Sequence, residues 1–144
     1  KLEIRGMLRE VTEIESIGDS CYNLARTVNR KRTGGNDFTE KQYEHIHQMM
    51  QLTENALKHM VAIVEDDAHV VDVNHSFNIE NEMNNYRSQL KNQNILDVNN
   101  KEYDYQMGVH YMDLIGECEK LGDYVVNVVE ARTNVKEKKT NENR

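Results

Sequence analysis

The chain has 144 residues and a formal net charge of −7, with 30% charged residues and no proline. An acidic protein is a poor match for nucleic acid, because phosphate backbones are bound by basic surfaces. No segment approaches the ~20 consecutive apolar residues that a membrane-spanning helix needs, so we expect no direct membrane insertion. Cys21 and Cys118 do not make a disulfide framework, which favours a reducing, cytoplasmic setting.

The first predicted helix covers residues 2–32, where apolar side chains recur at alternating steps of three and four. The expected apolar seam is formed by Ile4, Met7, Val11, Ile14, Ile17, Cys21, Leu24 and Val28. A Gly-Gly-Asn-Asp segment at residues 34–37 then breaks the pattern. We therefore expect the chain to turn here.

Three more helices are expected after this turn. The second begins near Thr39, where Thr39-Glu40-Lys41-Gln42 forms a capping box, and ends near an acidic cluster at residues 65–67. The third covers about 68–90, or extends to 96, and an asparagine-rich connection over 92–100 follows. The fourth covers about 101–135, with its own seam of Tyr103, Met107, Tyr111, Leu114, Cys118, Leu121, Val125 and Val128.

Helices joined by short links pack antiparallel. The pattern thus predicts an all-α fold: one up-and-down antiparallel helical bundle of four long helices over residues 1–135. Residues 136–144 are charged and polar with nothing to bury, which predicts a disordered tail. A single long coiled coil is the alternative, and the two breaks in the pattern disfavour it.

One nine-residue pattern occurs twice, at residues 15–23 and 119–127, with glutamate, glycine, aspartate and asparagine in the same register. Residues i and i+4 lie on one helix face, so Glu15 and Asp19 form one acidic row, and Glu119 and Asp123 form another. We expect each row to point away from the apolar seam of its helix.

These rows weaken an isolated helix. Like charges at i, i+4 cost roughly 0.2–0.5 kcal/mol, and an interior glycine costs about 1 kcal/mol relative to alanine. A local weakness repeated in the same register is typical of a functional site. We therefore predict that Glu15, Asp19, Glu119 and Asp123 are metal ligands. The alternative is that the glycines only let helices approach closely and the acids are solvated.

At these residues the sequence resembles the PhoU family. The family motif is Glu/Asp-x-x-x-Asp with an asparagine four residues on, once in each of two three-helix repeats; Asn23 and Asn127 stand at that asparagine. Residues 1–33 resemble the third helix of the first repeat, and 39–135 resemble the whole second repeat, in which residues 79–83 (Ile-Glu-Asn-Glu-Met) weakly match the middle helix. We thus expect the chain to be a fragment of a longer protein.

The resemblance implies a function without catalysis. It implies a metal-binding cytoplasmic regulatory domain, with iron, zinc, manganese or magnesium as the ion. The context it favours is the C-terminal domain of a sodium/phosphate cotransporter, tethered to the inner membrane by the transporter domain of the same chain, with a possible homodimer. A free phosphate-signalling regulator and a purely structural assembly module are the alternatives. The family's usual arginine after the motif glutamate is Ser16 or Lys120 here, which puts any role of that position in doubt.

An enzyme of the di-iron type is a further alternative, since carboxylate and histidine three residues apart can hold two metals in a bundle core. Such pairs occur at Glu44/His47 and at Asp72/His75. Glu44 and His47 flank their seam, however, and do not lie in it. Surface histidines are therefore the favoured interpretation.

Overall fold

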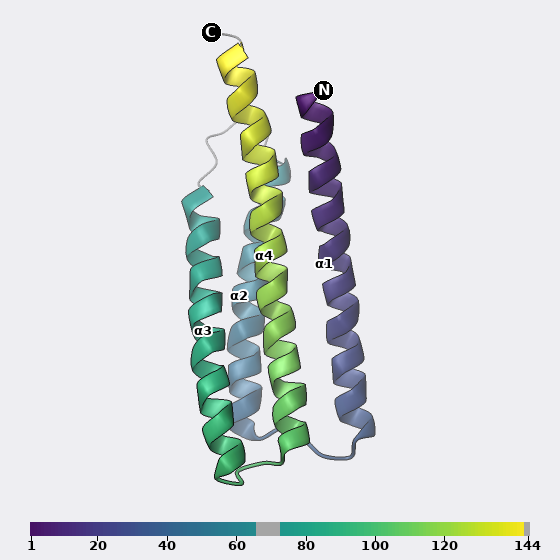
Figure 1. The fold of residues 1–144 in the computed structure, drawn as a ribbon, viewed down its shortest axis with the longest axis vertical. Helices are drawn as coiled ribbons and strands as arrows, with labels where there is room; N and C mark the ends of the chain where they lie inside the picture. Colours follow the sequence, from purple (N-terminus) through teal and green to yellow (C-terminus); the bar gives the residue numbers. More distant parts are fainter. Residues whose placement is uncertain (66–72, 143–144) are drawn as a thin grey trace.

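The computed structural model describes residues 1–65 and 73–142 of the chain. These residues form four helices: α1 (Leu2–Thr33), α2 (Glu40–Glu65), α3 (Val73–Asn99) and α4 (Tyr105–Glu142). Consecutive helices run in opposite directions, and α4 lies between α1 and α3 (Figure 1). The predicted all-α, up-and-down bundle is confirmed.

The start of α2 is fixed by the predicted capping box. The backbone N–H of Gln42 donates to Oγ1 of Thr39 at 3.1 Å, and the backbone N–H of Thr39 donates to Oε1 of Gln42 at 3.0 Å. This reciprocal pair satisfies donors that have no partner within the first helical turn.

The connection expected over residues 92–100 is wrong, because α3 continues to Asn99. Side-chain contacts hold this last part of the helix: Gln93 donates to Asp97 at 2.8 Å, and Tyr103 donates to Oδ1 of Asn94 at 2.6 Å. The real turn is short, with Lys101 at a φ of 60°. Asp104 then caps α4 by accepting from the backbone N–H of Met107 at 2.7 Å.

The end of α4 also differs from the expectation. We predicted a disordered tail from residue 136, but the helical backbone continues to Glu142. Lysine and glutamate are good helix formers, and adding a residue to an existing helix is far easier than starting one. A lack of apolar side chains therefore did not end the helix at 135.

The core is built around α4. All the residues predicted for its seam are buried except Tyr103, which is half-buried, and this prediction is confirmed. Met49 from α2 and Met83 from α3 are fully buried against it. Each buried side chain of this size contributes about 1.5–3 kcal/mol, so α4 is the element on which the fold depends.

The seam predicted for α1 is mostly wrong. Of the described helices, α1 packs closely only with α4. Its buried side chains are Glu10, Ile17, Ser20 and Thr27. Val11 is 63% exposed and Ile4 is 61% exposed. Thus α1 meets α4 through a mostly polar face and leaves most of its apolar stripe uncovered.

Candidate metal centre between α3 and α4

The two acidic rows have different surroundings. On α1, Glu15 and Asp19 are both exposed, and a Cβ added to the neighbouring Gly18 would meet nothing within 4 Å. This row stands on an open helix face. No described element covers it.

The α4 row lies against α3, and both Glu119 and Asp123 are half-buried. Unlike the row of α1, this row does not stand on an open helix face. A Cβ added to Gly122 would lie 3.0 Å from Sδ and 3.2 Å from Cε of Met83. Gly122 thus lets α3 approach α4 closely, which is the role that the alternative interpretation gave to the motif glycines. This approach partly covers Glu119 and Asp123.

The closeness of the helices brings a third carboxyl group to the row. Glu80 of α3 is half-buried, and its carboxyl group lies within reach of the side chain of Asp123. Burial, the side-chain interaction with Asp123 and the negative charges of Asp123, Glu130 and Glu119 raise the pKa of Glu80 to about 7. Two carboxyl groups can hydrogen-bond only when one of them carries a proton. Below pH about 7, Glu80 therefore holds a proton that it can donate to Asp123.

Glu119 is turned toward a basic residue. Its Oε2 lies 2.6 Å from Nε of Arg87 on α3. Burial raises the pKa of Glu119, the charge of Arg87 lowers it, and the charge of Asp123 raises it again. Arg87 passes close to Gly116, where an added Cβ would lie 3.8 Å from its Nε.

The sequence analysis missed Glu80 and Arg87 as members of this site. The match of residues 79–83 to a family helix pointed to the segment, but no feature of the sequence distinguished Glu80 from Glu82. Asn127, the asparagine of the repeated pattern, points toward α1, where its side-chain amide donates to Glu13 at 3.2 Å. The acidic row of α4 therefore extends toward α3 and not along its own helix.

Three carboxylates offer oxygen ligands to a hard cation. Among residues 1–65 and 73–142, no three His, Cys, Asp or Glu side chains are already arranged to hold an ion. Binding would require Glu80 to lose its proton and Glu119 to turn from Arg87. The carboxylate oxygens are therefore suitable ligands for a cation. Without a metal ion, the proton of Glu80 and the guanidinium group of Arg87 supply the positive charge.

The di-iron alternative finds no common centre among the described residues. His45 is hydrogen-bonded to the hydroxyl of Tyr111 at 2.8 Å, while Glu44 and His47 are exposed. His75, at the start of α3, lies near the C-terminal end of α2 instead. Its ring centroid is 4.6 Å from that of His59. Asp72 is outside the described residues. Of the residues in the predicted pairs that the structure describes, His47 and His75 are thus not brought together.

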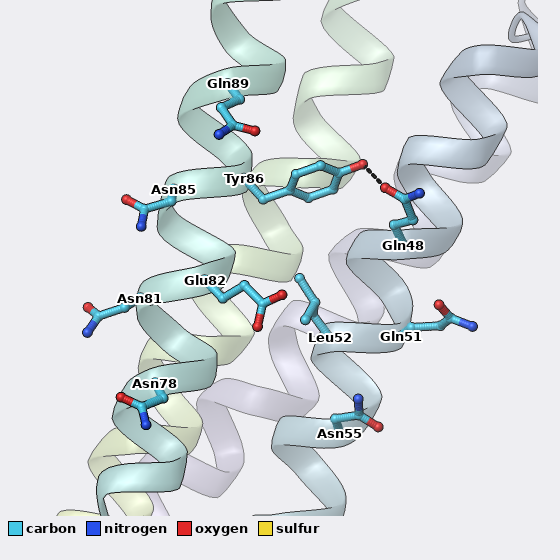
Figure 2. Close-up of a pocket in the computed structure, with 10 residues that line it drawn as sticks. All are labelled: Gln48, Gln51, Leu52, Asn55, Asn78, Asn81, Glu82, Asn85, Tyr86 and Gln89. Carbon is cyan, nitrogen blue, oxygen red and sulfur yellow. Dashed lines mark hydrogen bonds between the residues drawn. The ribbon is translucent and has the colours of Figure 1, made fainter.

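A hollow of about 670 Å³ lies between α2 and α3 and is lined mostly by the carboxamide side chains of asparagine and glutamine (Figure 2). The hydroxyl of Tyr86 donates to Gln48 across it, and Glu82 is its charged member. Neutral amides bind cations less strongly than carboxylates do. The α3–α4 contact is therefore the better candidate for a metal centre.

The fold and this contact define an all-helical bundle domain with paired carboxyl groups between two of its helices. A protein-family model described as the PhoU domain matches residues 46–131, more than half of the chain. The chain therefore belongs to the PhoU domain family. The match includes Glu80, Glu119 and Asp123, whereas the acidic row of α1 lies before it.

No curated protein and no solved structure matches the chain. In the part of the chain that the structure describes, no helix is long and apolar enough to cross a membrane.

Proposed function

We propose that this chain is a metal-binding regulatory domain in phosphate transport, with the ion held between α3 and α4 by Glu80, Glu119 and Asp123. The observation that carries this proposal is the close packing of α3 on α4 at Gly122, which brings the half-buried carboxyl group of Glu80 beside that of Asp123. Carboxyl groups held this close repel each other unless a positive charge lies between them. A proton fills that role at low pH, and a metal ion takes its place at higher pH.

The ligand chemistry favours hard ions. Carboxylate oxygen suits magnesium, manganese and ferric iron, whereas structural zinc sites rely on cysteine and histidine. Three carboxylates do not fill a six-coordinate shell, so water completes it. Glu15 and Asp19 form a second, weaker site, because their row is exposed and no described side chain joins it.

The family supports a phosphate-related regulatory role without catalysis. We propose that the domain is cytoplasmic and acts on the membrane domain of a sodium-dependent phosphate transporter in the same chain, which tethers it to the inner membrane. A homodimer is part of this proposal, because α1 leaves apolar side chains exposed. Fractionation of cells that express the full-length protein tests the tether. Recovery in the soluble fraction alone would favour a free regulator.

The metal proposal is tested by metal content and calorimetric titration with Mn²⁺ of the wild type, Asp123→Asn and Asp19→Asn. These variants make the same chemical change at equivalent positions of the two rows. We expect Asp123→Asn to lose most of the affinity and Asp19→Asn to retain the tighter site. If neither variant, nor Glu80→Gln, differs from the wild type, the ligand assignment is wrong. If the wild type binds no metal, the structural-module alternative holds.

A further inference from the structure

A groove of about 430 Å³ lies between α1 and α4, apart from the carboxyl pair. Arg87 of α3 reaches it by passing close to Gly116 of α4. Its lining residues are Asn23, Arg26, Thr27, Arg30, Arg87, Met112, Asp113, Gly116, Glu117 and Lys120. Basic side chains thus converge here from three helices of an acidic protein.

The two arginines of α1 are available to a ligand. Arg26 and Arg30 are exposed, stand one turn apart on the same helix face, and form no ion pair with a described residue. Arg26 also lies 5.9 Å from the ring of Tyr22. Planar guanidinium groups donate two parallel hydrogen bonds to oxyanions, and two of them at one groove favour an anionic ligand.

One residue that lines the groove carries a buried acceptor that has no donor. Oε1 of Glu117 accepts from Lys120 at 3.2 Å, while Oε2 is buried and finds no hydrogen-bond partner among the described residues. The side chain of Glu117 is only 14% exposed. A buried carboxylate oxygen without a donor destabilises the folded protein, because it has lost its hydration without gaining a partner. A ligand that brings a proton removes this destabilisation once the Glu117 side chain turns Oε2 into the groove.

We propose that this groove binds inorganic phosphate as its protonated anion. Arg26, Arg30 and Arg87 donate to the unprotonated oxygens, and Glu117, with its Oε2 turned into the groove, accepts from the P–OH group. Lys120 stays paired with Glu117. Asp113 also lines the groove but is exposed, so water screens its charge.

The carboxylate sets the specificity. Inorganic phosphate keeps at least one P–OH group at neutral pH, whereas sulfate has no proton to donate. A sulfate oxygen would be forced against Oε2 of Glu117, and the two acceptors would repel. A phosphate monoester is mostly a dianion without P–OH above its second pKa of about 6. The groove therefore prefers the free ion to both.

This inference is independent of the metal centre. The groove needs neither Glu80 nor Asp123, and phosphate binding is measured on metal-free protein. Arg87 is shared, because it pairs with Glu119 on one side and lines the groove on the other. Loss of metal binding and loss of phosphate binding are consequently separate results.

The test is calorimetric titration of the metal-free protein with inorganic phosphate, sulfate and phosphoserine at pH 7.5 and constant ionic strength. We expect phosphate to bind at least about tenfold more tightly than sulfate, the effect of one charged hydrogen bond. Arg26→Gln with Arg30→Gln should weaken phosphate binding at least about tenfold. The matched control is Arg5→Gln with Arg32→Gln, which removes the same charge from exposed positions of α1 outside the groove.

Glu117→Gln separates the role of the carboxylate from that of the arginines. Its amide can donate to sulfate, so the preference for phosphate should disappear while the fold, checked by circular dichroism, is unchanged. Any of three results would overturn the proposal. These are no saturable phosphate binding up to millimolar concentration, equal binding of sulfate or phosphoserine by the wild type, and equal losses in the two arginine pairs.

Discussion

The Nε atom of Arg87 lies 2.6 Å from Oε2 of Glu119, across the contact between α3 and α4. A cation of the protein itself therefore stands at the edge of the carboxyl cluster, next to the Glu80–Asp123 pair. The positive charge that the cluster needs has two internal sources, the proton on Glu80 and the guanidinium of Arg87. A metal ion competes with both.

Arg87→Gln should consequently raise the affinity for Mn²⁺. The variant frees Glu119 to turn toward the ion and removes a repulsive positive charge. A partly exposed ion pair is worth up to about 1 kcal/mol, so we expect a gain of a few-fold in titration calorimetry. Arg32→Gln, which makes the same change at an exposed site of α1, is the control. An affinity that falls or stays unchanged in Arg87→Gln would show that Glu119 takes no part in binding.

The stability of the metal-free protein should depend on the protonation of Glu80. Its pKa is about 7 in the folded protein and 4.5 ordinarily, so between these values the folded state holds a proton that the unfolded state has released. This contribution is complete below pH 4.5 and is lost as the pH rises through 7. Because water partly screens the site, we expect a loss on the order of 1 kcal/mol.

Urea unfolding at pH 5 and at pH 8, with a chelator present, measures this loss. Glu80→Gln keeps a donor to Asp123 at every pH, so it should be more stable than the wild type at pH 8 and close to it at pH 5. Glu82→Gln changes the same charge at an exposed position of α3 and controls for net charge. A wild-type difference between pH 5 and pH 8 that persists in Glu80→Gln would assign it to other groups.

The sequence predicted the helices well because their signals are local. The capping box at Thr39 and Gln42 formed as expected, and the predicted seam of α4 is buried apart from Tyr103. A helix that packs against several neighbours buries its whole apolar stripe. The apolar periodicity of its sequence is then enough to identify the face that points into the core. The end of α3 was missed because asparagine suggests a turn, while the contact that holds Asn94 comes from Tyr103, beyond the end of the helix.

The face of α1 was not predictable in the same way. Periodicity identifies an apolar stripe, but it does not say whether a partner covers that stripe. In α1 the polar face is fixed to α4 by contacts between distant residues, such as Arg132 with Glu10 at 3.6 Å and Asn127 with Glu13. The third carboxyl group of the site was missed for the same reason, since Glu80 meets Asp123 only through tertiary packing.

The N-cap of α2 offers a direct test of one local signal. Thr39→Ala removes the hydroxyl that accepts from the N–H of Gln42, and we expect it to lower the free energy of unfolding by about 1 kcal/mol. Thr12→Ala is the control, because Oγ1 of Thr12 donates to the carbonyl of Leu8 inside α1 and caps nothing. Alanine is also the better helix former there. Chemical denaturation should therefore show a loss in the first variant only.

The two motif glycines provide the sharpest comparison between the repeats. Gly18→Ala adds a methyl group where nothing lies within 4 Å, so the gain in helix propensity of about 1 kcal/mol should appear as added stability. Gly122→Ala has the same gain, but its Cβ would lie 3.0 Å from Sδ of the fully buried Met83. Overpacking costs about 1–3 kcal/mol, so this variant should be less stable than Gly18→Ala by at least about 1 kcal/mol.

The double variant Gly122→Ala with Met83→Leu tests the cause of that difference. If the clash with the methionine sulfur is responsible, a shorter side chain at position 83 should restore part of the stability that Gly122→Ala lacks. The same packing also carries Glu80 toward Asp123, so Gly122→Ala should weaken Mn²⁺ binding while Gly18→Ala leaves the tighter site unchanged. Equal stability of the two glycine variants would mean that α3 can withdraw from α4 without cost. The carboxyl pair would then no longer depend on the glycine beside it.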